Sequence, residues 1–321
     1  MLLNQSFKGL NEFWRYLVGV LIIFCFYFLG QLPLYGIVFW KFSSDPALGQ
    51  EALAQFESNL DFEMLGLDKN IGFLLLILMF GFALVGLYLV VRYIHKKEMI
   101  SYITSGIVID FKKVLFGFGL WMFISVLLET INYFISPETY TFRWIPESFI
   151  PLLLISILFL PIQTSFEELF FRGYVMQGIA FFAKNKWLPV LLSSVFFGLV
   201  HGTNPEVAKY GFWTMQFYYI IAGLFLALIT VMDDGLELAL GVHAATNIFG
   251  ATLFTYEGSV LQTDSLFISN EVKPWLMILG FILGSAIFIF VCFKKYAWPS
   301  FSTILDKVHV DNTEMTSIGQ S

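Results

Sequence analysis

The sequence predicts an all-α, polytopic membrane protein with about eight transmembrane helices. Of its 321 residues, 58% are hydrophobic and only 13% are charged, and the mean hydropathy is +0.76. Soluble domains are nearer half apolar and a quarter charged, so this excess is typical of a chain embedded in lipid. A membrane helix needs about 20 mostly apolar residues. Eight segments come close to that length: 14–40, 71–92, 114–135, 149–166 or slightly beyond, 187–203, 213–232, 236–254 and 274–293.

The basic residues predict how these helices are oriented. Lys and Arg favour the cytoplasmic side of a membrane. With the N-terminus in the cytoplasm and eight crossings, most of the 18 Lys and Arg residues, Arg172 included, fall on the cytoplasmic side. Both termini are therefore expected in the cytoplasm, and a prokaryotic plasma membrane is the expected location. The first apolar run is expected to be a retained helix, because it lacks a small-residue cleavage site. Only five basic residues fall outside: Lys41, Lys69, Arg143, Lys209 and Lys273.

The same segments divide the chain into parts. Cys25 and Cys292 both lie in apolar runs and are expected to be small core residues without a disulfide. The sequence has no stripe of basic residues that would indicate a nucleic-acid partner.

The predicted parts of the chain are residues 1–148, with about three helices and an acidic extracytoplasmic loop at 42–70; 149–254, a core that carries the polar residues described below; 255–296, the last loop and helix; and 297–321, a polar and disordered tail.

The fourth apolar segment carries charges that lipid penalises. The stretch SFEELFFRGY contains Glu167, Glu168 and Arg172. An ionised residue at the bilayer centre costs roughly 2.5–3.5 kcal/mol, so three unpaired ones would cost about 8–10 kcal/mol. Glu168 and Arg172 are four residues apart with the glutamate first, which predicts an ion pair on one helix face. Glu167 points about 100° away and has no local partner. This orphan carboxylate is the first candidate for function.

Two of the four histidines lie in apolar segments. The stretch FFGLVHGTN contains His201 with Phe197 one turn before it, and LGVHAATNIFG contains His243 with Asn247 one turn after it. Ionisable residues inside a membrane mark functional sites by default. Small residues near these positions allow helices to approach closely, so His201, His243, Asn247 and Glu167 are expected to surround one cavity. The remaining two histidines, both expected in solvent, are His95 and His309.

This set of side chains can activate water for amide hydrolysis. Glu167 and His201 together could hold and deprotonate a water molecule. His243 and Asn247 could donate hydrogen bonds to the oxyanion that develops on the attacked carbonyl. No serine or cysteine stands one turn from either histidine, so a covalent nucleophile has little support. The same set could instead bind zinc through Glu167, His201 and His243, although an HExxH motif is absent. Both chemistries stay open, with the metal-free one preferred.

The three motifs together resemble a known protein family. EELFFR, FGLVH and HAATN fit the EExxxR, FxxxH and HxxxN/D motifs, in the same order, of the type II CAAX prenyl endopeptidase and bacteriocin-processing family of intramembrane proteases, also called Abi or CPBP. The resemblance covers residues 149–254 and implies a bundle of eight helices with a conical cavity open to the cytosol. It implies that Glu167 and His201 activate the water and that His243 and Asn247 form the oxyanion hole. The supporting residues of the motifs are Glu168, Arg172 and Phe197.

The resemblance implies an endopeptidase that hydrolyses a peptide bond in a membrane-associated protein or peptide. Members cleave prenylated CAAX proteins or are associated with peptide processing and self-immunity, and the sequence does not choose between these. Members are often called metalloproteases, and a glutamate-dependent, metal-free mechanism has also been argued, so Zn²⁺ is the alternative cofactor. Two other readings stay open: a non-catalytic membrane scaffold or immunity protein, and a proton-coupled transporter. A transporter would predict inverted repeats, and the sequence shows none.

Overall fold

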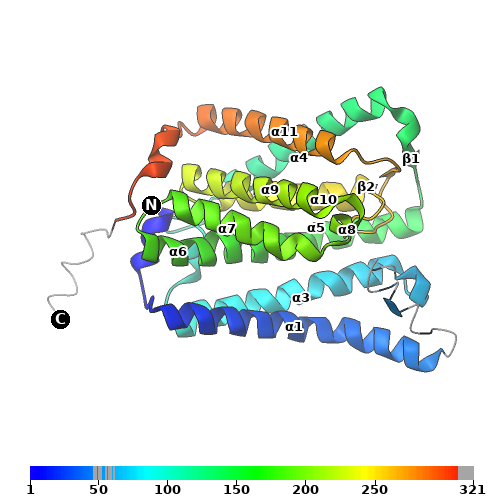
Figure 1. The fold of residues 1–321 in the computed structure, drawn as a ribbon, viewed down its shortest axis with the longest axis horizontal. Coiled ribbons are helices and arrows are strands. Elements are labelled where there is room, and N and C mark those ends of the chain that lie inside the picture. Colours follow the sequence, from blue (N-terminus) through cyan, green and yellow to red (C-terminus); the bar gives the residue numbers. More distant parts are fainter. Residues whose placement is uncertain (46–48, 50–52, 55, 57–59, 61, 310–321) are drawn as a thin grey trace.

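The protein folds as a bundle of helices that is closed at one end by a small sheet (Figure 1). The computed structural model describes residues 1–45, 49, 53–54, 56, 60 and 62–309. The predicted all-α membrane class is confirmed, and each of the eight predicted segments lies within a helix to within two residues. The helices are α1 (Phe13–Ser44), α3 (Lys69–Leu89), α4 (Phe111–Ile135), α5 (Pro146–Glu168), α6 (Met176–Ala183), α7 (Trp187–Val200), α8 (Pro205–Tyr210), α9 (Phe212–Asp233), α10 (Glu237–Thr252) and α11 (Pro274–Lys295).

Fewer of these helices reach membrane-spanning length than expected. Within the described ranges, six helices are long and apolar enough to cross a bilayer. The predicted spans at 187–203 and 236–254 correspond to α7 and α10, which have 14 and 16 residues. At 1.5 Å per residue, α10 is about 24 Å long, shorter than the roughly 30 Å of a bilayer core. Of the eight predicted segments, these two are therefore shorter than a full bilayer crossing. For α10 the reason is its place inside the bundle, where it packs against α4, α5 and α9.

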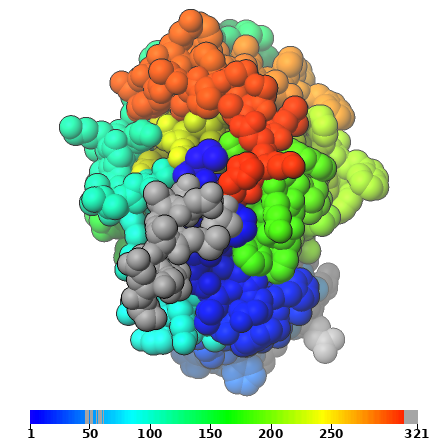
Figure 2. Space-filling model, turned by 90° about the vertical axis from the view of Figure 1, so that its left-hand side faces the viewer, coloured from blue at the N-terminus to red at the C-terminus, as the bar shows by residue number. Residues whose placement is uncertain are grey.

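The N-terminus and the 3₁₀ turn at residues 301–305 lie at one end of the bundle, called here the terminal end, and the strands lie at the other, the sheet end (Figure 1). Figure 2 views the molecule from the terminal end, where the N-terminal residues meet the last part of the chain. Arg172, expected on the cytoplasmic side, instead lies fully buried inside the bundle. It therefore contributes nothing to the charge bias that predicts orientation.

Helix α10 is held close to α4 by glycines. An added Cβ at Gly241 would collide with the carbonyl oxygen of Val114, and one at Gly117 would lie 2.8 Å from the carbonyl oxygen of Leu238. Small residues let two membrane helices approach to backbone contact. The close crossing fixes α10 against α4 two residues before His243.

Replacing Gly241 with alanine is expected to lower the free energy of unfolding by about 1–3 kcal/mol, because the added methyl group overpacks the crossing. The matched control is Gly250→Ala in the same helix, where an added Cβ meets nothing within 4 Å. Unfolding of both variants by denaturant in detergent measures the difference. Equal stability of the two variants would show that the crossing tolerates the extra volume.

Three short strands close the sheet end. A partly buried ionic cluster ties their connecting loop to the helices: the carboxylate of Asp264 lies 3.1 Å from the ammonium of Lys69 and 3.5 Å from the guanidinium of Arg143. The hydroxyl of Ser148 also donates to Asp264, at 2.6 Å. The strands stand in the order β1–β3–β2, with β1 antiparallel and β2 parallel to β3. They are β1 (Tyr140–Phe142), β2 (Phe254–Tyr256) and β3 (Phe267–Ser269).

The C-terminal segment is ordered further than the predicted disordered tail from residue 297. Trp298 is buried and its indole N–H donates to Asp233 at 3.0 Å, which anchors the segment after α11. A 3₁₀ turn follows (η8, Phe301–Leu305), and the backbone N–H of Val308 donates to the carbonyl of Lys184 at 3.1 Å. Residues 310–321 lie outside the described residues. So do three acidic residues of the predicted loop at 42–70, namely Glu51, Glu57 and Asp61.

Candidate active site

The polar residues of the three motifs meet in the interior of the bundle. Glu167 and Glu168 end α5, His201 begins a 3₁₀ turn at the end of α7 (η7, His201–Thr203), and His243 lies in α10. Oε2 of Glu167 lies 3.9 Å from Nε2 of His201 and 3.7 Å from Nε2 of His243. Glu167 is only 5% exposed and His243 only 7%. The structure thus brings together side chains that lie far apart in the sequence and that the motifs predict to share one site.

Hydrogen bonds determine which ring nitrogen of each histidine faces Glu167. Nδ1 of His201 lies 2.7 Å from the carbonyl oxygen of Phe197. Nδ1 of His243 lies 2.6 Å from Oε1 of Glu168. A carbonyl or carboxylate oxygen only accepts, so these contacts assign the proton of each neutral ring to Nδ1. The lone pair on Nε2 of each ring is then directed toward Glu167.

Three hydrogen-bond acceptors therefore face one another. Oε2 of Glu167 is buried and has no hydrogen-bond partner among the residues that the structure describes. Its separations from the two Nε2 atoms exceed a hydrogen bond, and buried acceptors without donors are costly. A water molecule can donate to two such acceptors, and a shared proton or a cation could also satisfy them. The arrangement is suited to holding one of these three species.

Glu168 contacts more than its predicted partner. Its Oε1 accepts a hydrogen bond from Arg172 at 3.0 Å, which confirms the predicted ion pair, and both side chains are fully buried. The same oxygen also accepts a hydrogen bond from Nδ1 of His243, at 2.6 Å. The guanidinium of Arg172 also donates to the carbonyl of Gly223 at 3.2 Å and lies 4.4 Å from the ring centre of Phe197. Glu168 and Arg172 therefore connect all three motif helices to α9.

The helix changes pitch directly after the two glutamates. Residues Leu169–Val175 form a π-helical segment, η6, before α6 begins. Such segments are rare in proteins overall, and those that occur are often found at functional sites. The hydroxyl of Tyr174 in η6 lies 3.0 Å from Nε2 of His95, whose Nδ1 lies 2.7 Å from the carbonyl of Leu10.

The expectation that His95 is solvated is wrong, because it is fully buried against η6 and α1. Burial lowers the pKa of His95 to about 4. His309 is exposed, as expected.

Gln163 links two of the predicted site residues and was not itself predicted. Its Nε2 donates to Oε1 of Glu167 at 2.9 Å, and its Oε1 accepts from Nδ2 of Asn247 at 3.1 Å. Its position in the sequence could have indicated this role, because Gln163 is a polar residue one helical turn before Glu167 in an apolar segment. Asn247 therefore reaches Glu167 through Gln163, and only its remaining amide hydrogen could serve as the predicted oxyanion donor.

Two further residues support His201 from the sheet end. The ring of Tyr219 in α9 stacks on His201 with ring centres 4.7 Å apart. The hydroxyl of Tyr219 donates to the buried carboxylate of Glu206 and accepts from Asn204 at 3.0 Å. Glu206 also accepts the backbone N–H of Val260 at 3.1 Å. None of these residues belongs to a motif, so the sequence offered no sign of the contact.

Two cavities lie at the terminal end of the bundle, away from these residues. Their volumes are about 320 Å³ and 370 Å³. Neither is lined by Glu167, His201, His243 or Asn247. The predicted conical cavity around the motif residues is therefore not one of them.

The candidate zinc ligands suit the metal by donor type but not by spacing. Zinc lies about 2.0–2.2 Å from nitrogen and oxygen ligands, so tetrahedral ligand atoms stand about 3.3 Å apart. The distances from Oε2 of Glu167 to the two Nε2 atoms are longer, at 3.7 and 3.9 Å. Across the described ranges, no group of three or more His, Cys, Asp or Glu side chains has the arrangement of a metal site.

Comparison with known proteins singles out the same part of the chain. An uncharacterized protein, YyaK of Bacillus subtilis (strain 168), is 29% identical over 272 residues, which cover 84% of this chain and 88% of that protein. No solved structure matches. Residues 146–249 match the family model described as type II CAAX prenyl endopeptidase Rce1-like, and this segment contains all three motifs. Over these residues the chain is similar to the Rce1-like family of type II CAAX prenyl endopeptidases, and this similarity supports a membrane protease at the level of the family.

Proposed function

We propose that this protein is an intramembrane endopeptidase that hydrolyses a peptide bond of a membrane-associated protein or peptide with a water molecule activated by Glu167. One observation carries the proposal: the unpartnered Oε2 of Glu167 faces Nε2 of both His201 and His243. The family supports a protease of the CAAX type at a coarser level.

Glu167 would act as the general base. Its Oε2 takes a proton from a water molecule that is held against Nε2 of His201. The water oxygen bonds to the carbonyl carbon, and the carbonyl electrons move onto oxygen to form a tetrahedral oxyanion. The C–N bond then breaks as the leaving nitrogen takes the proton that Glu167 carries. Such general acid–base catalysis typically contributes about 10²–10⁴-fold to a rate.

His243 and Asn247 would stabilise the oxyanion. The 2.6 Å contact between Nδ1 of His243 and Glu168 leaves Nε2 facing the site. If the shared proton that can satisfy the three facing acceptors sits on Nε2 of His243, that atom becomes a donor to the oxyanion, and Asn247 adds its remaining amide hydrogen. Donors aimed at developing charge in a water-poor site are often the largest single contribution to catalysis.

The test is cleavage of anchored peptides by the purified full chain in detergent. One substrate is a farnesylated peptide that ends in a CAAX sequence, and a second is the same peptide without the prenyl group. Mass spectrometry should find an internal fragment pair from an anchored peptide with the wild type and none with His201→Ala. Absence of cleavage by the folded wild type would favour a non-catalytic scaffold or immunity protein.

Zinc is the second candidate chemistry, because the donor types suit it. Titration of the active protein with 1,10-phenanthroline is expected to leave the hydrolysis rate unchanged. A loss of activity that added Zn²⁺ restores would contradict the metal-free proposal.

Gln163→Leu is expected to lower kcat by about 10–100-fold, since a hydrogen bond to a charged group contributes about 1.5–3 kcal/mol. The reason is that Glu167 and Asn247 both lose their shared partner. The matched control is Gln31→Leu in α1, whose side chain contacts Met79. A Gln163→Leu variant as active as the control would remove Gln163 from the site.

The terminal end is proposed to face the cytoplasm, because most basic residues lie there and basic residues favour that side. Labelling of Lys112→Cys at the terminal end and Lys273→Cys at the sheet end with a membrane-impermeant thiol reagent checks this. In intact cells, only Lys273→Cys is expected to react above the background of the two native cysteines. Reaction of Lys112→Cys instead would reverse the orientation.

A further inference from the structure

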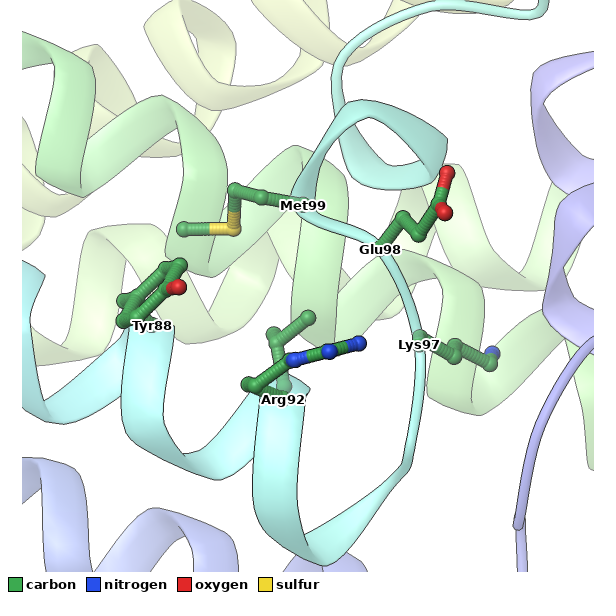
Figure 3. Close-up of a pocket in the computed structure, with 6 residues that line it drawn as sticks. Tyr88, Arg92, Lys97, Glu98 and Met99 are labelled. Atoms are coloured by element: carbon green, nitrogen blue, oxygen red, sulfur yellow. The ribbon is translucent and has the colours of Figure 1, made fainter.

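Two adjoining cavities open at the terminal end, remote from the candidate active site. They share the side chains of Lys97 and Glu98 as walls, and their volumes are about 320 Å³ and 370 Å³. Figure 3 shows the smaller one, into which Arg92 extends toward the 97–98 segment while the carboxylate of Glu98 points away from the guanidinium. The larger is formed by the N-terminal segment and the turn before α4. The two cavities with their shared wall are called here the paired cavity.

The lining of the paired cavity is strongly basic. Lys97 is nearly fully buried, and among the described residues its ammonium contacts the carbonyl oxygen of Ser6, at 3.1 Å, and the face of the Tyr102 ring. It forms no ion pair within the part of the chain that is described. Burial and then the charge of Lys8 lower the pKa of Lys97 to about 7. Four basic side chains line the two cavities against one acidic one, Glu98: Lys8, Arg92, Lys96 and Lys97.

A buried ammonium without a counter-ion is unfavourable, and an anion that enters the cavity would relieve this. Arg92 is exposed, and its guanidinium has no hydrogen bond or ion pair in the described ranges, so its planar donors are available. Arginine and lysine together are the usual partners of phosphate oxygens. The chemistry of the cavity therefore selects an anion with several oxygens.

The surroundings of the cavity indicate where that anion comes from. Ile107, which lines it, is 92% exposed, and Val108 beside it is 73% exposed. Tyr88 lines the other cavity, and Tyr93 stands one turn further on, both largely exposed. Apolar and aromatic side chains around basic ones are typical of the zone where a membrane meets water. Acyl chains could cover these apolar groups, whereas a free ion would leave them in water.

We infer that the paired cavity binds the phosphate of an anionic phospholipid headgroup from the leaflet at the terminal end. Basic pockets beside transmembrane helices on the cytoplasmic side are suited to such headgroups. The inference is independent of peptide hydrolysis.

The walls of the paired cavity also touch the helix that carries the glutamates. The backbone carbonyl of Ser101, a lining residue, accepts a hydrogen bond from Gln177 in α6 at 2.7 Å. Tyr102 packs against Gly173 in η6. A bound headgroup would therefore hold the 95–107 segment against η6 and α6, and raise the thermal stability of the whole chain.

The experiment measures thermal unfolding of the full chain in detergent micelles that contain phosphatidylglycerol, phosphatidylcholine or added inorganic phosphate. Phosphatidylglycerol is expected to raise the Tm of the wild type by at least about 2 °C. The Arg92→Gln/Lys97→Met variant is expected to lose most of this shift. Lys112→Gln removes one exposed charge at the same end outside both cavities and should keep the shift.

Three results would overturn the inference. One is an equal shift in the double variant, and another is an equal shift with phosphatidylcholine. The third is an equal shift with inorganic phosphate alone, which would make the cavity a free-phosphate site. If the double variant does not fold, Arg92→Gln alone serves, because the Arg92 side chain makes no hydrogen bond or ion pair with the described residues.

Discussion

Glu167→Gln is expected to lower the rate of peptide hydrolysis by about 10²–10⁴-fold, the range of general acid–base catalysis. Glutamine keeps the size of the side chain and its contact with Gln163 but cannot take a proton from water. The loss should appear in kcat with little change in KM, because the proton moves only in the transition state. Initial rates on an anchored peptide measure both constants.

The matched control for this change is Glu129→Gln. Glu129 lies in α4 and accepts a hydrogen bond from Tyr140 at 2.6 Å, near the sheet end and away from the motif residues. It should retain the wild-type rate. Equal activity of the Glu167→Gln and Glu129→Gln variants would remove Glu167 from the chemistry.

Arg172→Met is expected to lower the free energy of unfolding by about 3–5 kcal/mol, the cost of removing one partner of a buried ion pair. The variant leaves the carboxylate of Glu168 buried without its cation, and the carbonyl of Gly223 loses a donor. Denaturant unfolding in detergent measures the loss. The control is Lys112→Met, which replaces an exposed basic residue. Its free energy of unfolding should stay within about 0.5 kcal/mol of the wild-type value.

A double variant measures how much of this loss of stability comes from the interaction between Glu168 and Arg172. Glu168→Gln/Arg172→Met removes both charges, so its loss of stability should be smaller than the sum of the two single losses. Additive losses would mean that Glu168 and Arg172 stabilise the bundle independently.

Local spacing in the sequence was enough to predict several contacts. Glu168 and Arg172 are four residues apart, so an α-helical pitch alone places them together, and the ion pair follows. Long apolar runs predict the helices, because a membrane demands them. The three motifs predict that Glu167, His201 and His243 share a site, and Oε2 of Glu167 lies within 4 Å of Nε2 of both histidines.

Contacts between helices could not be predicted from spacing. The hydrogen bonds from His243 to Glu168 and from Asn247 to Gln163 depend on how α10 lies against α5, and that packing is set by glycines that contact α4. The same holds for His95, whose burial depends on the contact with η6. Hydropathy also overestimated the length of α10, because a buried helix is as apolar as a spanning one.

The most direct test of peptide hydrolysis by activated water is mass spectrometry of products made in H₂¹⁸O. The substrate is the anchored peptide that the wild type cleaves, and Glu167→Gln serves as the blank. We predict an internal cleavage whose new carboxyl group carries one ¹⁸O atom, at a rate that falls to background in the variant. Undiminished labelling by Glu167→Gln, or an intact peptide after incubation with the folded wild type, would contradict the account.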